Sequence, residues 1–167
     1  MLDGGTEDGA LATSSRLVAH ALSELPHATF LVFDTDMRFV LVRGAAVQEN
    51  AMDPVQFEGR LASESLPAER WAMYEPMYRA ALAGVDSEKQ VTSPDNSREY
   101  LLRTRPVLAD DGSIIGGVLV ATDISDVKSA QRRALESERR FSLAMRSAPI
   151  GMAVVSLDRT LLEVNHA

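Results

Sequence analysis

Two aspartates stand close enough in the sequence to share a cation, and this is the first chemistry to consider. Asp34 and Asp36 flank a single threonine between two apolar runs, and hard divalent cations prefer carboxylate oxygens. The rest of a calcium-binding loop is missing, because no further acidic ladder, glycine or closing glutamate follows. Aspartate also favours tight turns, where its side chain hydrogen-bonds the backbone. We therefore interpret the pair as turn residues and predict no metal site.

Histidine and cysteine, which most often hold haem, sulfur-linked cofactors or transition metals, are sparse. His20, His27 and His166 are scattered along the chain, and cysteine is absent. The lack of cysteine excludes a disulfide framework, thiolate metal sites and any cofactor linked through sulfur. No Ser-His-Asp or Cys-His set emerges, so the sequence gives no argument for catalysis.

An aromatic row in residues 67–84 is the strongest candidate for a binding surface. Trp71, Tyr74 and Tyr78 recur at helical spacing, with Met77 beside them. Aromatic rings supply contact area with a polar tip, and methionine adapts to irregular ligands. The row fits either the wall of a pocket or plain core packing, and core packing is the commoner use.

The segment 98–108 offers partners for this row. Tyr100 and Leu102 are the candidates to face it from a sheet. Arg103 and Arg105 alternate with other residues and therefore share one face of the predicted strand. Two arginines on one face could grip an anionic ligand, but a solvated or salt-bridged face is the commoner outcome.

Helical patterns flank and interrupt the predicted strands. The Gly-rich, acidic leader 1–10 is expected to be disordered, and apolar residues at helical spacing predict a helix over 11–25. Pro67 and Gly84 bracket a second helix, in the usual asymmetry of helix ends. Pro76 inside it should kink or split it.

Five short runs rich in β-branched residues predict strands, with two inside 28–42 and three at 89–93, 98–108 and 113–122. A connector helix over 124–148 follows. Antiparallel strands with helices segregated on one face make an α+β fold.

The chain also contains a weak internal repeat. A shift of 122 residues places "VVSLDRTLLEV" over "VFDTDMRFVLV", with Asp158 over Asp36. A helical stripe and a proline precede both segments. We interpret residues 149–167 as the truncated start of a second copy of the domain.

The order of elements resembles that of a PAS domain. The residues that carry the resemblance are the Asp-containing first hairpin and "RTRPVLADDGSIIGGVLVATDIS", which is similar to the closing PAS strands and their Asp-Ile-Thr junction, with Ser125 in the last place. The resemblance extends from residue 26 to about residue 125, with the PAS domain itself assigned to 26–123, and a second PAS domain would begin near Glu138. It implies a PAS-like five-stranded antiparallel sheet, flanked by the N-terminal helix 11–25 and the long connector helix 124–148.

The resemblance also implies candidate sites. In PAS domains the helix in the place of residues 67–84 lines a ligand cavity, which makes a pocket from Trp71, Tyr74, Met77, Tyr78, Tyr100 and Leu102. That helix contains no histidine, where haem-binding members usually place the axial ligand, so the resemblance argues against haem. Covalent flavin or chromophore is excluded by the absence of cysteine, and the ligand stays unknown. Asp123 and Ser125 would form a signal junction, with Arg103 or Arg105 pairing with Asp123.

The expected role is that of a sensory or interaction module without enzymatic activity. It would bind a small molecule or mediate dimerisation through the helices 11–25 and 124–147, and relay a conformational signal to a downstream effector. PAS domains commonly precede histidine kinases, cyclic-di-GMP enzymes or phosphatases. Two alternatives stay open: a purely structural dimerisation module with a filled core, and a small-molecule-binding enzyme of cystatin-like α+β form.

Charge and hydropathy set expectations about partners and location. The net charge is −7, and an acidic surface repels phosphate backbones, so we expect no nucleic-acid partner. No apolar run reaches the length of a membrane span, and the acidic start is unlike a signal peptide. These features predict a cytoplasmic, bacterial-type signalling protein with no membrane partner.

Overall fold

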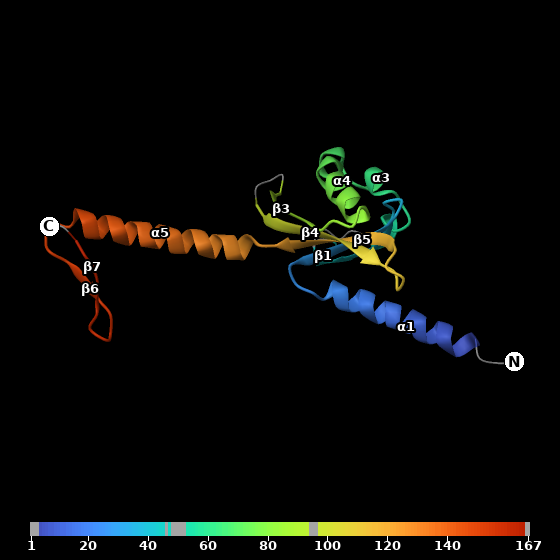
Figure 1. Ribbon diagram of the computed structural model, residues 1–167, viewed down its shortest axis with the longest axis horizontal. Helices are drawn as coiled ribbons and strands as arrows, with labels where there is room; N and C mark the ends of the chain where they lie inside the picture. The colour runs from blue at the N-terminus through green and yellow to red at the C-terminus, as the bar shows by residue number, and fades with distance from the viewer. Residues whose placement is uncertain (1–3, 46, 48–52, 94–96, 166–167) are drawn as a thin grey trace. The chain divides into compact units, whose positions relative to one another are not determined.

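The structure divides into two compact units (Figure 1). It is a computed structural model that describes residues 4–45, 47, 53–93 and 97–165. The first unit reaches Ile124 and the second starts at Ser125.

The first unit is built on a five-stranded antiparallel sheet. Its strands are β1 (Ala28–Asp34), β2 (Phe39–Gly44), β3 (Ser87–Thr92), β4 (Glu99–Leu108) and β5 (Ile114–Asp123). They lie in the order β2-β1-β5-β4-β3, so β1 and β5, the first and last strands of this unit, are neighbours. The predicted α+β class and five-stranded sheet are confirmed.

Helices lie on both sides of this sheet. A 3-10 turn, η1 (Pro54–Gln56), and a short helix, α3 (Ala62–Ser65), lead to α4 (Ala68–Leu82). In Figure 1, α3 and α4 lie on one side of the sheet and α1 (Gly4–Ser23) lies on the other. Across the described ranges, no helix combines the length and apolar character that crossing a bilayer requires.

The first helix starts earlier than the sequence predicts. α1 begins at Gly4, so residues 4–10, expected to be a disordered leader, are helical, while residues 1–3 lie outside the described part. Helix formation is cooperative, and a helix already nucleated extends at little further cost. Propagation from the apolar stripe within 11–25 explains the difference.

α4 keeps its continuity through Pro76, so the predicted alternative of a split helix is wrong. Its end follows the sequence prediction. Gly84 adopts φ +80°, the left-handed conformation that favours glycine after a helix. The Gly84 and Val85 amides donate to carbonyls of the last turn, at 2.9 Å each. This end fixes the point at which the chain turns from α4 into β3.

One aromatic contact joins α4 to the sheet. Phe33 of β1 lies across the ladder from Gly117 of β5, and a Cβ on Gly117 would stand only 2.4 Å from its ring atom Cζ. The same ring stacks on Tyr78 of α4, with centroids 3.9 Å apart and planes 14° apart. Both aromatic side chains are buried. The missing side chain at Gly117 is therefore what lets the Phe33 ring lie close to the sheet.

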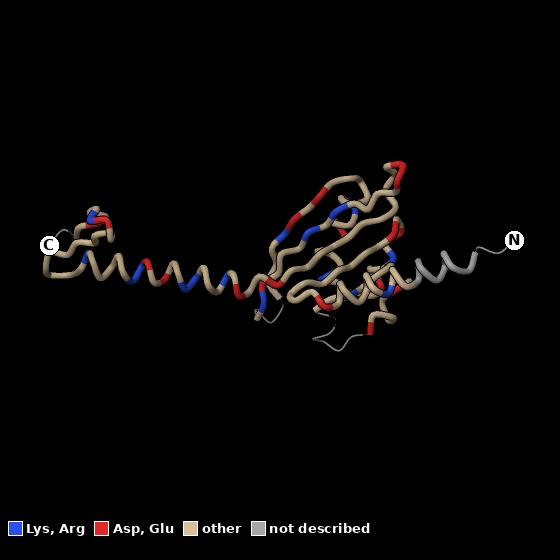
Figure 2. The backbone as a smooth tube through the Cα atoms, turned by 90° about the horizontal axis from the view of Figure 1, so that it is seen from below, with Lys and Arg blue, Asp and Glu red and all other residues tan. Residues whose placement is uncertain are grey.

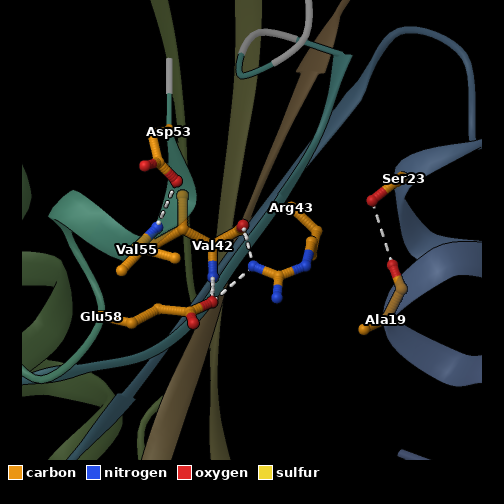
Figure 3. A network of polar contacts seen from close by, with 7 residues as sticks. All are labelled: Ala19, Ser23, Val42, Arg43, Asp53, Val55 and Glu58. Atoms are coloured by element: carbon orange, nitrogen blue, oxygen red, sulfur yellow. Dashed lines mark hydrogen bonds and ion pairs between the residues drawn. The ribbon is translucent and has the colours of Figure 1, made fainter. Parts of the chain in front are cut away.

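The exposed edge of the sheet at β2 is covered by an acidic side chain (Figure 3). The Glu58 carboxylate accepts a hydrogen bond from the Val42 amide at 3.2 Å and forms an ion pair with Arg43. Arg43 also donates to the carbonyl of Val42 at 2.7 Å. An unpaired edge is a template for unwanted pairing, so these contacts protect β2.

The second unit consists of a long helix and a hairpin. α5 (Ser125–Ser147) is followed by β6 (Ala153–Val155) and β7 (Leu161–Val164), which form a two-stranded sheet. Figure 2 shows acidic and basic residues interleaved along α5. This pattern is typical of a solvated helix face.

The predicted hairpin repeat is confirmed at the level of individual residue pairs. The first hairpin pairs Leu31 with Val42, Val32 with Leu41 and Phe33 with Phe39; the second pairs Ala153 with Val164, Val154 with Glu163 and Val155 with Leu161. Each pair repeats after 122 residues, and the register shift falls at the same place. Met37 and Arg159, also 122 apart, both take left-handed φ values of 62° and 68°. The turn conformation therefore repeats together with the strand pairing.

Substitution of Gly117 tests the aromatic contact. Gly117→Ala should lower the free energy of unfolding by about 1–3 kcal/mol, the usual cost of overpacking a core, because the new methyl group meets the Phe33 ring. Urea denaturation followed by circular dichroism measures the change. Gly151→Ala, at an exposed position with open space around it, is the control and should leave the first unit unaffected. Equal stability of Gly117→Ala and wild type would contradict the role assigned to the glycine.

Candidate functional site

The pocket candidates from the sequence come together in one cluster between α4 and the sheet. On α4, Tyr74, Met77 and Tyr78 are buried, while Trp71 is half-buried and packs against them. The sheet contributes the buried Leu102 and the half-buried Tyr100 of β4. The structure thus brings all six residues to the same interior.

Aromatic rings occupy the centre of this interior. Trp71 meets the edge of Tyr78 at a centroid distance of 5.9 Å, and Tyr74 lies 6.1 Å from Tyr78. With the Phe33 stack, Tyr78 contacts three aromatic neighbours. Aromatic pairs at these separations contribute about 0.5–1.5 kcal/mol each beyond their buried area. The aromatic row of Trp71, Tyr74 and Tyr78 therefore serves core packing, whether or not it also borders a ligand.

Three hydroxyl groups in this interior have no hydrogen-bond partner among the described residues. They belong to Tyr78, Thr104 and Ser87. Ser87 of β3 lies directly opposite Thr104 of β4 in the ladder, so the two hydroxyls share one place on the inner face. A buried polar group without a partner costs about 1–3 kcal/mol. Such groups mark the position where a polar ligand would find donors and acceptors.

Sequence reasoning missed Ser87 and Thr104. Side chains two apart on a strand share a face, so the choice of Leu102 as an inward residue places Thr104 inward as well. Ser87 could not be found in this way, because its position depends on the register between β3 and β4. The alternation of side chains along a strand was therefore enough to identify Thr104, but not Ser87.

Burial raises the pKa of the tyrosines in this cluster. The pKa of Tyr78 is raised above its ordinary value, first by burial and then by the neighbouring Tyr74. Burial also raises the pKa of Tyr74, with the positive charge of Arg70 acting against it. Among the described residues, no Asp, Glu, Lys or Arg is buried. The interior is therefore uncharged at neutral pH and suits neutral groups.

The second candidate site is a corner of the sheet where the ends of β1, β4 and β5 meet. The Asp123 amide donates to the carbonyl of His27 at 2.7 Å, and the Ile124 amide donates to that of Glu99 at 2.8 Å. The Asp123 carboxylate, with 13% of its side chain exposed, pairs with Arg98 at 3.3 Å. α5 begins immediately afterwards, at Ser125. The corner fixes the last residue of the sheet before the connector helix.

The predicted pairing of Asp123 with Arg103 or Arg105 is wrong. Both arginines are exposed and have other partners: Arg103 binds Glu88 at 2.8 Å and Arg105 binds Asp86 at 3.1 Å. The register places Tyr100 opposite Asp123, so both arginines lie farther along β4. Their salt bridges agree with the interpretation that this strand face is solvated or salt-bridged, rather than with an anion-binding role.

The acidic pair of the first hairpin acts in a turn, as interpreted from the sequence. The Asp34 carboxylate accepts hydrogen bonds from the amides of Asp36 and Arg38, at 2.9 and 2.8 Å. Within the described ranges, no group of three or more His, Asp or Glu side chains is placed to hold a metal ion. His20 and His27 lie apart from the interior cluster on α1 and before β1, and His166 is outside the described residues.

Comparisons with known proteins agree with the fold. A family model described as "PAS fold" matches residues 22–129. No curated protein sequence matches the chain. Among solved structures, the C-terminal domain of a Streptococcus mutans protein is 15% identical, with a TM-score of 0.54, over 70% of this chain and 89% of that one.

Two VqmA structures are also similar. A phage VqmA–DPO complex is 18% identical, with a TM-score of 0.55, over 80% of this chain and 62% of that one. A Vibrio cholera VqmA–ligand–DNA complex is 20% identical, with a TM-score of 0.53, over 72% and 58%. At these identities the likeness shows the fold.

The DNA complex corrects one expectation from the sequence. A net charge of −7 led us to expect no nucleic-acid partner. The VqmA structure shows that a chain with this fold occurs in a complex with DNA. The charge of one such domain therefore does not exclude a nucleic-acid partner, because another part of a protein can make the contact.

The raised pKa of Tyr78 predicts that the first unit loses stability at alkaline pH. Above pH about 10, tyrosines of the unfolded chain lose their protons, while the folded state keeps Tyr78 protonated because its pKa is raised. The stabilisation is therefore complete below that pH and is lost as pH rises. Tyr78→Phe should reduce this loss, and at neutral pH it should keep or increase the stability, since the removed hydroxyl has no described partner.

Urea unfolding at pH about 8 and about 11, on either side of the ordinary tyrosine value, measures the effect. Tyr100→Phe, at a half-buried position of the same cluster, is the matched control and should retain the alkaline loss. An unchanged loss in Tyr78→Phe would contradict the assignment.

Proposed function

Because the chain belongs to the PAS fold family, we propose that residues 26–124 act as a sensory module that binds a small molecule and relays a conformational signal through α5. This segment itself performs no catalysis in the proposal. An effector elsewhere in the same protein, such as a kinase, a cyclic-di-GMP enzyme or a phosphatase, would receive the signal.

The observation that carries the ligand-binding role is the set of unpartnered hydroxyls beneath α4. Tyr78, Thr104 and Ser87 place three neutral polar groups, each without a partner among the described residues, in an interior made mostly of apolar side chains. A small neutral molecule with donors and acceptors would satisfy them and bury its apolar surface among the aromatic rings. The VqmA complexes support the idea by analogy, because a chain with this fold occurs in complex with DPO in one of them and with a ligand in the other.

The relay role is supported by the corner at Asp123. A displacement of β4 or β5 by a ligand would change the Arg98–Asp123 pair, and this pair adjoins the first residue of α5. The helix begins within two residues of the sheet, so little chain is available to absorb such a change. The short connection in the sequence supports the proposed relay.

A second candidate function is a structural dimerisation module with a filled core. The stacked Phe33 and Tyr78 rings favour it, because they occupy the centre of the interior. Exposed apolar side chains also lie on both flanking helices: Leu17 and Val18 on α1, and Val127, Leu135, Phe141 and Leu143 on α5. Amphipathic helices of this kind pair readily with a second copy.

We also propose that residues 138–165 open a second PAS copy. Support comes from the hairpin repeat and from exposure. Val155 and Leu161 are 53% and 59% exposed, whereas their counterparts Phe33 and Phe39 are 1% exposed. The face that forms the core of the first unit is thus exposed in the second hairpin.

The ligand proposal predicts a co-purifying molecule. Native mass spectrometry of protein purified from cells should show a mass above that of the chain. Refolding from denaturant should remove this mass and lower the melting temperature, because the ligand stabilises the folded state. Thr104→Val removes one unpartnered hydroxyl and should reduce the fraction of loaded protein. Wild-type protein that carries no added mass and melts identically after refolding would favour the filled-core alternative.

The relay proposal predicts that Asp123→Ala uncouples α5 from the ligand. In wild type, removal of the ligand should change hydrogen exchange in the first turn of α5, at residues 126–130. In Asp123→Ala this change should disappear, while exchange in β5 still responds. Arg103→Ala, which breaks an exposed pair on the same strand, is the control and should behave as wild type. A full response of α5 in Asp123→Ala would reject the junction.

A further inference from the structure

The attachment of the second hairpin to α5 requires an explanation. All four β7 side chains are exposed, as are Ala153 and Val155 at the two ends of β6. Leu162, for example, is 64% exposed. Burial of the strands' apolar side chains therefore contributes little to holding the hairpin against the helix. A two-stranded hairpin without such burial is marginal in water.

Asn165, immediately after β7, supplies the missing connection. Its side-chain amide nitrogen donates to the carbonyl of Met145 and to that of Ile150, at 2.9 Å each. Its side-chain oxygen accepts from the Met152 amide at 2.6 Å, and its own amide donates to the Met152 carbonyl at 3.0 Å. One residue thus joins the last turn of α5 to the loop that leads into β6, at Ile150 and Met152.

The position of each bond explains its effect. Met145 lies in the last turn of α5, whose final carbonyls have no partner within the helix. The Asn165 amide satisfies one of these carbonyls from a distant point in the sequence. Asn165 is 9% exposed and Met145 only 2%, so water has little access to the contact. Hydrogen bonds in such shielded positions are stronger than exposed ones.

The equivalent residue of the first hairpin is used differently. Arg43 precedes Asn165 by 122 residues, and its side chain pairs with Glu58 and the Val42 carbonyl at the edge of the sheet. The first hairpin is held instead by β5, which pairs along the whole length of β1. Among the described residues, the second hairpin pairs with no third strand.

We propose that Asn165 is a positioning residue that makes α5 and the β6–β7 hairpin one rigid body. Any rotation or shift of α5 is then delivered to the hairpin without loss. The hairpin becomes the receiving element of the relay, a use that rests on the proposed function, whereas the rigid coupling itself does not.

Spin labels can measure the coupling directly, because the chain contains no native cysteine. Arg133→Cys on α5 and Leu157→Cys at the exposed hairpin turn provide two labelling sites. Pulsed dipolar spectroscopy on the full chain should give one narrow distance distribution. Asn165→Ala should broaden it, since the hairpin then loses its attachment. Glu163→Ala, at an exposed position of β7, is the control and should keep the narrow distribution.

Asn165→Asp separates the two halves of the contact. Aspartate retains an oxygen that accepts from the Met152 amide, but it has no N–H groups for the Met145 and Ile150 carbonyls. The distribution should broaden while the Met152 amide stays protected from hydrogen exchange. A narrow distribution in Asn165→Ala, or a broad one in wild type, would overturn the proposal. Neither outcome depends on whether the first unit binds a ligand, so failure here is distinguishable from failure of the proposed function.

Discussion

The contact on which the first unit depends is the Phe33 ring lying over Gly117 and stacked on Tyr78. It sets how closely α4 approaches the sheet, because a side chain at Gly117 would displace the ring. Trp71 and Tyr74 in turn pack around Tyr78. A molecule that enters this interior has to contact or move the Tyr78 ring, and a moved ring shifts α4 relative to β1. Core stability and the proposed ligand response therefore depend on the same few atoms.

Local patterns in the sequence were enough for the order of elements. Strand alternation, the turn at Asp34 and the glycine at Gly84 each act through their near neighbours, so reading the chain in order finds them. Interactions across strands were not accessible in this way. Asp123 pairs with Arg98 because the β4–β5 register places Tyr100 opposite it. The sequence prediction used only the adjacency of the two strands. It therefore chose Arg103 and Arg105, which lie a few residues too far along β4.

The two hairpins show that one local structure can be supported by different surroundings. Turn geometry and pairing repeat after 122 residues because they depend on short-range backbone bonds. The first hairpin gains its stability from β5 and from the core beneath α4. The second relies on the hydrogen bonds of Asn165. The repeat was visible in the sequence, but the different support was not, since it depends on a contact across twenty residues.

The hydrogen bond between the Asp123 amide and the His27 carbonyl has a consequence for how such chains are assembled. It places the residue before β1 beside the last residue of β5, so the chain enters and leaves the sheet at one corner. Domains whose two ends are close together tolerate insertion into another chain, because the flanking segments keep their separation. The first unit is therefore suited to a place inside a longer chain, where it can be inserted without separating the segments on either side.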